Sequence, residues 1–151
     1  MTIELIKSII LEDIRKKSYY ECQSVPDIDA RYRTEAGTEK MDEIRRDMEE
    51  GFMQLNRRCV RWLNNSYTAF ADNTQPESES MVYDFKISER RANGKIEPLT
   101  DAMHRLVVEY ALSKFYSTVN AVDLSNKHSL HAIDAANEID ELLYTKQPPI
   151  L

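Results

Sequence analysis

The sequence predicts a mainly α protein, a small helical bundle in a single domain of residues 1–151 with one long helix and a short β-hairpin. Apolar residues recur at steps of three and four over several long stretches, which is the spacing of one helix face. The chain has only three glycines, too few for the tight turns of an all-β sandwich or barrel. One short stretch alternates between apolar and polar residues, as a half-buried strand does.

The first predicted helix covers residues 2 to about 17, and Thr2 is suited to cap its start. Its apolar face consists of Ile3, Ile6, Ile10 and Ile14. From residue 18 to 37 this spacing is lost, and Pro26 disfavours helical geometry in the residue before it. We therefore expect an irregular but packed crossing segment after the first helix.

The longest predicted helix extends from Thr38, its candidate cap, to about Asn65. Its apolar stripe is formed by Met41, Ile44, Met48, Phe52, Leu55, Cys59 and either Trp62 or Leu63. At about 1.5 Å per residue this helix is about 40 Å long, more than a domain of this size requires. Gly51 leaves the phase of the stripe unchanged, so we expect a local bend there and not a break. Such a helix is expected to project or to line an interface.

A polar run over residues 72–80 contains one proline and no apolar anchor before the next strand, and it predicts a flexible linker. Residues 81–88 then alternate between apolar and polar side chains, as a half-buried strand does. The pair Asn93-Gly94 favours a hairpin turn, and residues 95–97 can return as a second strand. The sequence therefore predicts a hairpin over residues 81–97, which must pack on the helices or on a neighbouring subunit.

A pair of helices is predicted over residues 100–145. Thr100 can cap the first of them, and the negative charge of Asp101 suits its first turn. The apolar band of this helix is wide, which predicts burial on more than one side and makes it the expected core helix. The second helix is expected to begin at Ser125 or Ser129 and to end near Tyr144, before two prolines.

The composition is that of one soluble domain. A chain of 151 residues with 42% apolar and 30% charged residues can bury a core and is too charged for a membrane protein. Its net charge of -6 disfavours nonspecific binding to nucleic acid unless positive charge is segregated onto one surface. The two cysteines have no metal-ligand spacing, and the first residues have no signal-peptide pattern. We therefore expect a cytoplasmic protein.

No catalytic motif is present in the sequence. Three glycines cannot form a phosphate-binding loop, and no serine lies in a glycine-flanked turn. The adjacent carboxylates of Asp140 and Glu141 point to different parts of a helix surface, which disfavours an acid and base pair. We expect that the protein is not an enzyme and that it uses no cofactor.

Two fragments have the spacing of metal ligands on a helix, Asp101 with His104, and His128 with His131 and Asp134. A di-iron bundle site would also need inward glutamates on two further helices. The glutamates of the long helix are instead spaced to pair with arginines on the same helix. Because positions near helix starts explain the fragments as well, no metal site is predicted.

Two basic clusters are the candidate interaction sites. They comprise Arg57, Arg58 and Arg61 beside Trp62, and Lys86, Arg90, Arg91 and Lys95 around the predicted hairpin. Arginines next to an aromatic ring can bind phosphates and stack on bases, although a solvated helix face and a soluble turn carry the same residues. Four positive charges at a hairpin tip on an acidic protein are a candidate docking site for an acidic protein surface or for nucleic acid.

From residue 81 to 143 the predicted order is a strand, a basic turn, a helix that follows a proline, and a closing helix. The sequence across the helix start reads Ile96-Glu97-Pro98-Leu99-Thr100-Asp101-Ala102-Met103-His104, and the helix continues through Leu106, Val107, Val108, Tyr110, Ala111 and Leu112. In this pattern the segment resembles the head-to-tail connector, or adaptor, proteins of tailed bacteriophages. The preceding eighty residues are longer than that family usually has there.

The resemblance implies a virion assembly protein, a subunit of a homo-oligomeric ring between the portal and tail proteins, with a central passage for DNA. It places the protein in the cytoplasm of a bacterial host and in the virion. The predicted hairpin, the long helix and the C-terminal residues 148–151 would gain partners in such an assembly. The alternative is a small helical nucleic-acid-binding or regulatory protein that uses both basic clusters to contact phosphates.

Overall fold

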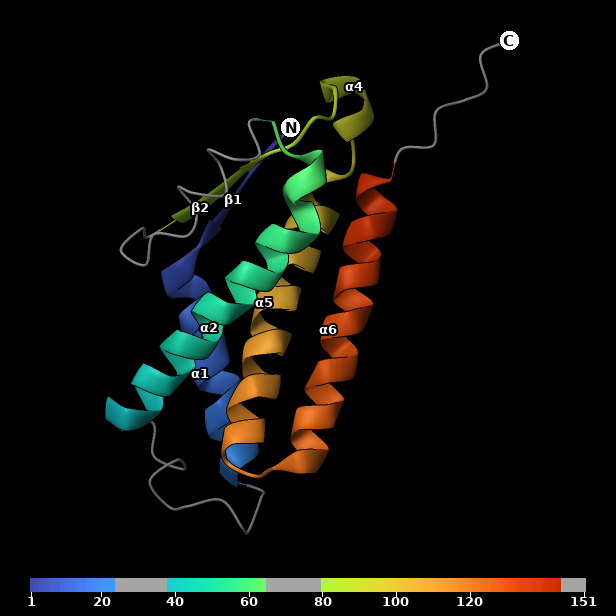
Figure 1. Cartoon of the computed structure of the whole chain (residues 1–151). Coiled ribbons are helices and arrows are strands. Elements are labelled where there is room, and N and C mark those ends of the chain that lie inside the picture. Colours follow the sequence, from blue (N-terminus) through green and yellow to red (C-terminus); the bar gives the residue numbers. More distant parts are fainter. Residues whose placement is uncertain (24–37, 65–79, 145–151) are drawn as a thin grey trace.

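The computed structural model describes residues 1–23, 38–64 and 80–144. Within them, four long helices lie along one another and a two-stranded sheet lies beside one end of the bundle (Figure 1). The helices are α1 (Lys7–Gln23), α2 (Thr38–Cys59), α5 (Ile96–Thr118) and α6 (Val122–Leu143); the strands are β1 (Thr2–Ile6) and β2 (Ser80–Asp84); short helices are η2 (Val60–Trp62) and α4 (Glu89–Ala92). The predicted fold class, a mainly α small helical bundle with one long helix and a short β-hairpin, is confirmed by the helices and a two-stranded antiparallel sheet.

The sheet joins the start of the chain to a strand from its middle. Strand β2 lies where the alternating pattern predicts it, but it pairs antiparallel with β1, with Thr2 opposite Asp84 and Ile6 opposite Ser80. The predicted hairpin partner at residues 95–97 is therefore wrong, because these residues enter α5. The predicted first helix is also wrong at its start: residues 2–6 are extended, Ile3 and Leu5 point into the core, and α1 begins only at Lys7.

Helix α5 begins one turn before the predicted position. Pro98 lies in its first turn, where a missing backbone N–H breaks no helical hydrogen bond, so the proline fits within the start of this helix. Thr100 is therefore not the predicted cap; it lies inside α5, where its hydroxyl donates to the carbonyl of Ile96 at 2.6 Å. Asn120, with φ of 60°, forms the turn after α5, and α6 begins directly at Val122, earlier than predicted.

Helix α2 confirms the predicted long helix, and η2 continues it to Trp62. It runs unbroken through Gly51, where it crosses α5 at close range. A Cβ atom on Gly51 would lie 2.9 Å from the backbone oxygen of Val107, which is closer than real Cβ contacts allow. The glycine therefore permits the helix crossing. Helix α2 does not project from the fold, because its apolar stripe packs against the core.

Helix α5 is the core helix, as predicted. It contacts α1, α2, α6 and β1, so it is buried on more than one side. About half of its residues are buried. Helix α1 continues to Gln23, so residues 18–23 are helical and not the irregular segment expected there. The remainder of that segment, the linker apart from Ser80 and the C-terminal residues 148–151 lie outside the described residues. No helix in the described parts of the chain combines the length and apolarity that crossing a membrane requires.

Candidate functional site

His128 of α6 is held between two carboxylates that belong to different helices. Its side chain is 4% exposed. Ring atom Nδ1 is hydrogen bonded to Glu109 of α5, and Nε2 lies 2.9 Å from both carboxylate oxygens of Glu21 in α1. One imidazole therefore connects three helices through hydrogen bonds at both of its nitrogens.

The two carboxylates stabilise the protonated form of His128. Burial lowers the pKa of the imidazole, but the hydrogen bonds and charges of Glu109 and Glu21 outweigh it and raise the pKa to about 9. Burial likewise works to raise the pKa of both glutamates, and their contact with His128 reverses this, so both pKa values are lowered. Lys17 lies 3.8 Å from Glu109, and Lys127 lies 3.6 Å from Glu21. The cluster is a network of paired charges at neutral pH.

The ring of Tyr116 covers one side of this network. It stacks on His128 with the ring centroids 5.5 Å apart and an interplanar angle of 22°. Burial raises the pKa of the Tyr116 phenol, and the charge of Glu21 raises it further, so the phenol remains protonated. The stacked ring limits the orientations available to the His128 imidazole.

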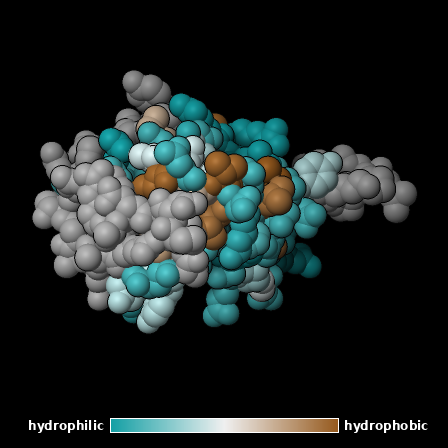
Figure 2. Space-filling model, turned by 90° about the horizontal axis from the view of Figure 1, so that it is seen from below, coloured by the Kyte–Doolittle hydropathy of each residue, from teal (hydrophilic) through white to brown (hydrophobic). Residues whose placement is uncertain are grey.

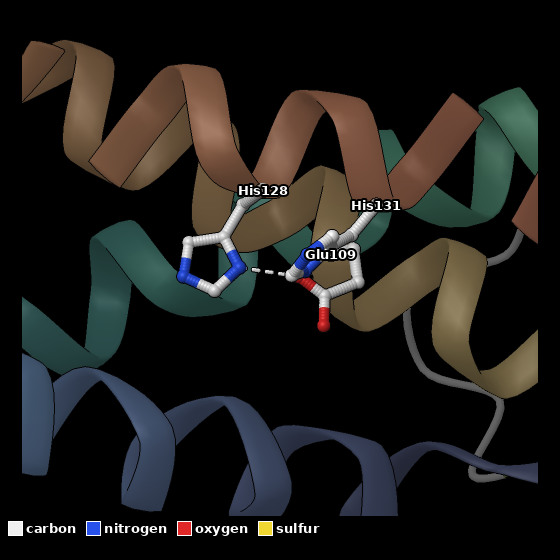
Figure 3. A group of neighbouring side chains, drawn as sticks. All are labelled: Glu109, His128 and His131. Atoms are coloured by element: carbon white, nitrogen blue, oxygen red, sulfur yellow. Dashed lines mark hydrogen bonds and ion pairs between the residues drawn. The ribbon is translucent and has the colours of Figure 1, made fainter. Parts of the chain in front are cut away.

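His131 adds a second imidazole one turn later on α6. Its Nδ1 atom lies 3.7 Å from the same Glu109 oxygen that bonds to His128, and the two histidine rings are 6.0 Å apart. Figure 3 shows Glu109 between the two histidines, which project from one face of α6. One donor atom from each of these three residues lies within 4.8 Å of the other two. We call Glu109, His128 and His131 the histidine–glutamate cluster.

Only one of the two sequence fragments with metal-ligand spacing contributes residues to this cluster. The structure brings together His128 and His131, whereas Asp134 is exposed. The other fragment is divided, because His104 bonds Asp13 at 2.9 Å and Asp101 pairs with Arg105. The sequence reasoning missed both Glu109 and Glu21. The signal for Glu109 was its position as a single charge within the apolar run from Leu106 to Leu112.

The two predicted basic clusters lie at the same end of the bundle, at the end of α2 and around α4 (Figure 1). The backbone N–H of Lys86 donates to the carbonyl of Trp62 at 2.7 Å, which joins their two segments. Not all members are available to a partner. Arg58 forms a two-point ion pair with Asp140 of α6, with contacts of 3.0 and 2.6 Å, and Arg61 stacks on Trp62 at 4.1 Å.

Besides Arg61, the residues that remain exposed at this end are Arg57, Lys86, Arg90 and Arg91, with Lys95 half-buried. The structure places the last three on or beside α4 and its following turn, so the predicted position at a hairpin tip is wrong. We call these five residues the basic end.

Helix α6 carries exposed apolar side chains along its outer face. It packs mainly against α5, and Val122, Leu130 and Ile133 are each more than half exposed, as is Tyr144 directly after the helix. Figure 2, seen from the end of the bundle where α5 turns into α6, shows apolar side chains gathered there among hydrophilic ones. We call Leu130 and Ile133, which are one turn apart, the apolar face of α6.

Comparison of the chain with protein-family models, with curated proteins and with solved structures finds no match.

Proposed function

We propose that this chain is a non-enzymatic assembly protein that forms a ring with copies of itself, as a head-to-tail connector subunit between the portal and the tail of a phage. The sequence resemblance implies this function, and the apolar face of α6 is the observation that supports it best. Leu130 and Ile133 are 62% and 53% exposed and adjacent on one helix surface. Contiguous exposed apolar surface is typical of sites that bind another protein. The proposal places the protein in the bacterial cytoplasm and in the virion.

A ring of identical subunits needs two different surfaces on each subunit that fit each other. The outer side of α6 offers apolar residues beside exposed acidic ones, Asp123, Asp134 and Glu141. The basic end offers the opposite charge on another part of the molecule. Such a pair of surfaces has the electrostatic complementarity that sets the register of an interface. In the proposed ring, the apolar face of one copy meets the basic end of the next.

The test is the absolute mass of the chain by light scattering over a concentration series. We expect the mass to rise toward one large closed oligomer, and electron microscopy to show rings. The double variant Leu130→Ser and Ile133→Ser is expected to remain monomeric. Ile9→Ser removes an equally exposed apolar residue from α1 and serves as the matched control. A wild-type chain that remains monomeric at every concentration, or a double variant that assembles like the control, contradicts the proposal.

A second candidate function, binding of nucleic acid, is favoured by the convergence of both basic clusters at one end of the bundle. If phosphates bind there, replacing Arg57 and Arg91 by glutamine should weaken binding to a DNA duplex for all sequences alike. Each lost phosphate contact should reduce the slope of log affinity against log salt by about 0.9. Fluorescence anisotropy of labelled DNA measures both effects. Undetectable binding at low salt would exclude this function in favour of the first.

A further inference from the structure

We propose that the histidine–glutamate cluster, Glu109, His128 and His131, binds a divalent transition-metal ion. Two imidazole nitrogens and one carboxylate oxygen are a ligand set suited to zinc, cobalt or iron. Calcium and magnesium are disfavoured because they select oxygen ligands. The ligands come from α5 and α6, the two most closely packed helices of the bundle. The inference is independent of the proposed assembly function.

The spacing of the donor atoms suits one ion. Bonds of about 2.0–2.2 Å in tetrahedral geometry place two ligand atoms about 3.3 Å apart. Glu109 and His131 lie close to this separation, at 3.7 Å. The hydrogen-bonded pair of Glu109 and His128 must part slightly, because two ligands of one ion are farther apart than two hydrogen-bonded atoms. Side-chain rotation is sufficient, since all three residues already face one another (Figure 3).

Glu21 supplies the feature that separates a metal site from a chance group of polar side chains. A histidine that binds a metal through one nitrogen usually donates its other N–H to a carboxylate, which fixes the ring. Nε2 of His128 has this partner in Glu21, at 2.9 Å from both oxygens. Its Nδ1 atom is thereby directed at Glu109 and His131. The stacked ring of Tyr116 holds the same orientation.

The site is open to solvent on one side. The carboxylate oxygen of Glu109 that would bind the ion is Oε2, which faces both histidines. His131 is half exposed, so an ion can reach the cluster without opening of the bundle. Lys17 approaches Oε1 of Glu109 at 3.8 Å, whereas Oε2 faces both histidines. A bound ion takes the place of the proton between His128 and Glu109, and that proton passes to solvent.

The test is titration of the full chain, first stripped with a chelator, with Zn²⁺ alone and with Co²⁺ alone. We expect one ion per chain by calorimetry, visible absorption of Co²⁺ in a low-coordinate site, and a higher melting temperature with Zn²⁺. His131→Asn should lose the absorption and the shift in melting temperature. His104→Asn is the matched control, since His104 is also paired with a carboxylate but has no second histidine beside it.

Two outcomes would overturn the site. The first is the absence of saturable binding by the wild-type chain, and the second is binding by His131→Asn that equals the control. A cooperative unfolding transition of each metal-free variant verifies that the variant is folded. Glu21→Gln tests the positioning role, with an expected loss of metal affinity of about 10- to 100-fold at unchanged stoichiometry. Unchanged affinity of this variant would contradict the role of Glu21.

Discussion

Asp47 is a buried carboxylate in α2 whose ionisation should weaken the folded state. It is 4% exposed, and its Oδ2 atom has no hydrogen-bond partner among the described residues. Burial raises the pKa of Asp47 from 3.8 to about 6, with attraction from Arg46 opposing the shift and repulsion from Glu50 adding to it. We predict that Asp47→Asn stabilises the protein at neutral pH, because asparagine has the same shape without the charge.

The magnitude follows from the two pKa values. The folded chain binds the proton of Asp47 more tightly than the unfolded chain does, so this stabilising contribution is present below about pH 4 and is lost as the pH rises through 6. A rise from 3.8 to about 6 corresponds to about 3 kcal/mol at most. Solvent screening reduces this value, and the asparagine amide must itself find hydrogen-bond partners. We expect Asp47→Asn to add about 1–2 kcal/mol to the free energy of unfolding at pH 7.

Urea denaturation between pH 4 and 8 measures this difference. The variant and the wild type should have nearly equal stability at pH 4, and the gap should open between pH 4 and 7. Other titrating groups are common to both proteins and cancel. Asp42→Asn, an exposed position on the same helix, is the control for removing a carboxylate that is not buried. A variant that is less stable than the wild type at pH 7, or whose advantage is independent of pH, would refute this reasoning.

Three further substitutions test the packing of the bundle by urea denaturation. Gly51→Ala should destabilise the fold by about 1–2 kcal/mol, because the added Cβ overpacks against the Val107 backbone by more than the roughly 1 kcal/mol that alanine gains in a helix. Tyr83→Phe should cost about 1–3 kcal/mol, because the buried Asn56 oxygen loses the hydroxyl that donates to it. Arg58→Gln should cost about 0.5–1 kcal/mol, less at high salt, because its ion pair with α6 is half exposed.

Exposed positions supply the controls for these three predictions. Met53→Ala on α2 and Tyr144→Phe after α6 should each change the free energy of unfolding by less than about 0.5 kcal/mol. A Gly51→Ala variant that is more stable than the wild type would mean that α2 and α5 can move apart without loss of stability. A cost for Arg58→Gln that does not decrease with salt would mean that its aliphatic stem, and not its charge, stabilises the contact with α6.

The long helices were predictable because each carries an apolar stripe that local sequence reveals. The partner of β2 was not, since the pairing of Thr2 with Asp84 spans more than half of the chain. Residues 2–6 also satisfy two periods at once. Ile3 and Ile6 continue the helical spacing of α1, while Ile3 and Leu5 alternate as a strand does, and only burial against the core selects the second.

The starts of α5 and α6 were misplaced for a different reason. The sequence predicts threonine and serine as helix caps, whereas in the structure they bond to backbone carbonyls within or between the helices. The hydroxyl of Thr100 donates to Ile96, and that of Ser125 donates to Ser113 at 2.9 Å. A hydroxyl can either cap a helix or bond to a carbonyl one turn earlier, and sequence alone does not distinguish these roles.

The sequence indicated the two histidines of the histidine–glutamate cluster but not its glutamate. The spacing of His128 and His131 placed them on one helix face, but nothing local connected them with Glu109, which is 19 residues away from His128. Glu21 was further obscured, because it lies in a stretch expected to be irregular. The ligands in a bundle come from different helices. The apolar stripes do not determine which of these helices pack beside one another. The identity of the ligands and of their Glu21 partner therefore depended on knowing that α1 and α6 both flank α5.

The position of α6 depends on polar contacts as well as on apolar packing. Its buried face consists of His128, Ala132, Ala135, Ile139 and Leu143, so two of the five side chains are small and one is charged. Ion pairs join it to α1, α2 and α5 at different points along its length. The proposed metal ligands and the apolar face therefore occupy different sides of one helix. Because His131→Asn leaves the apolar face intact and the double serine variant leaves the ligands intact, each proposal can fail without the other.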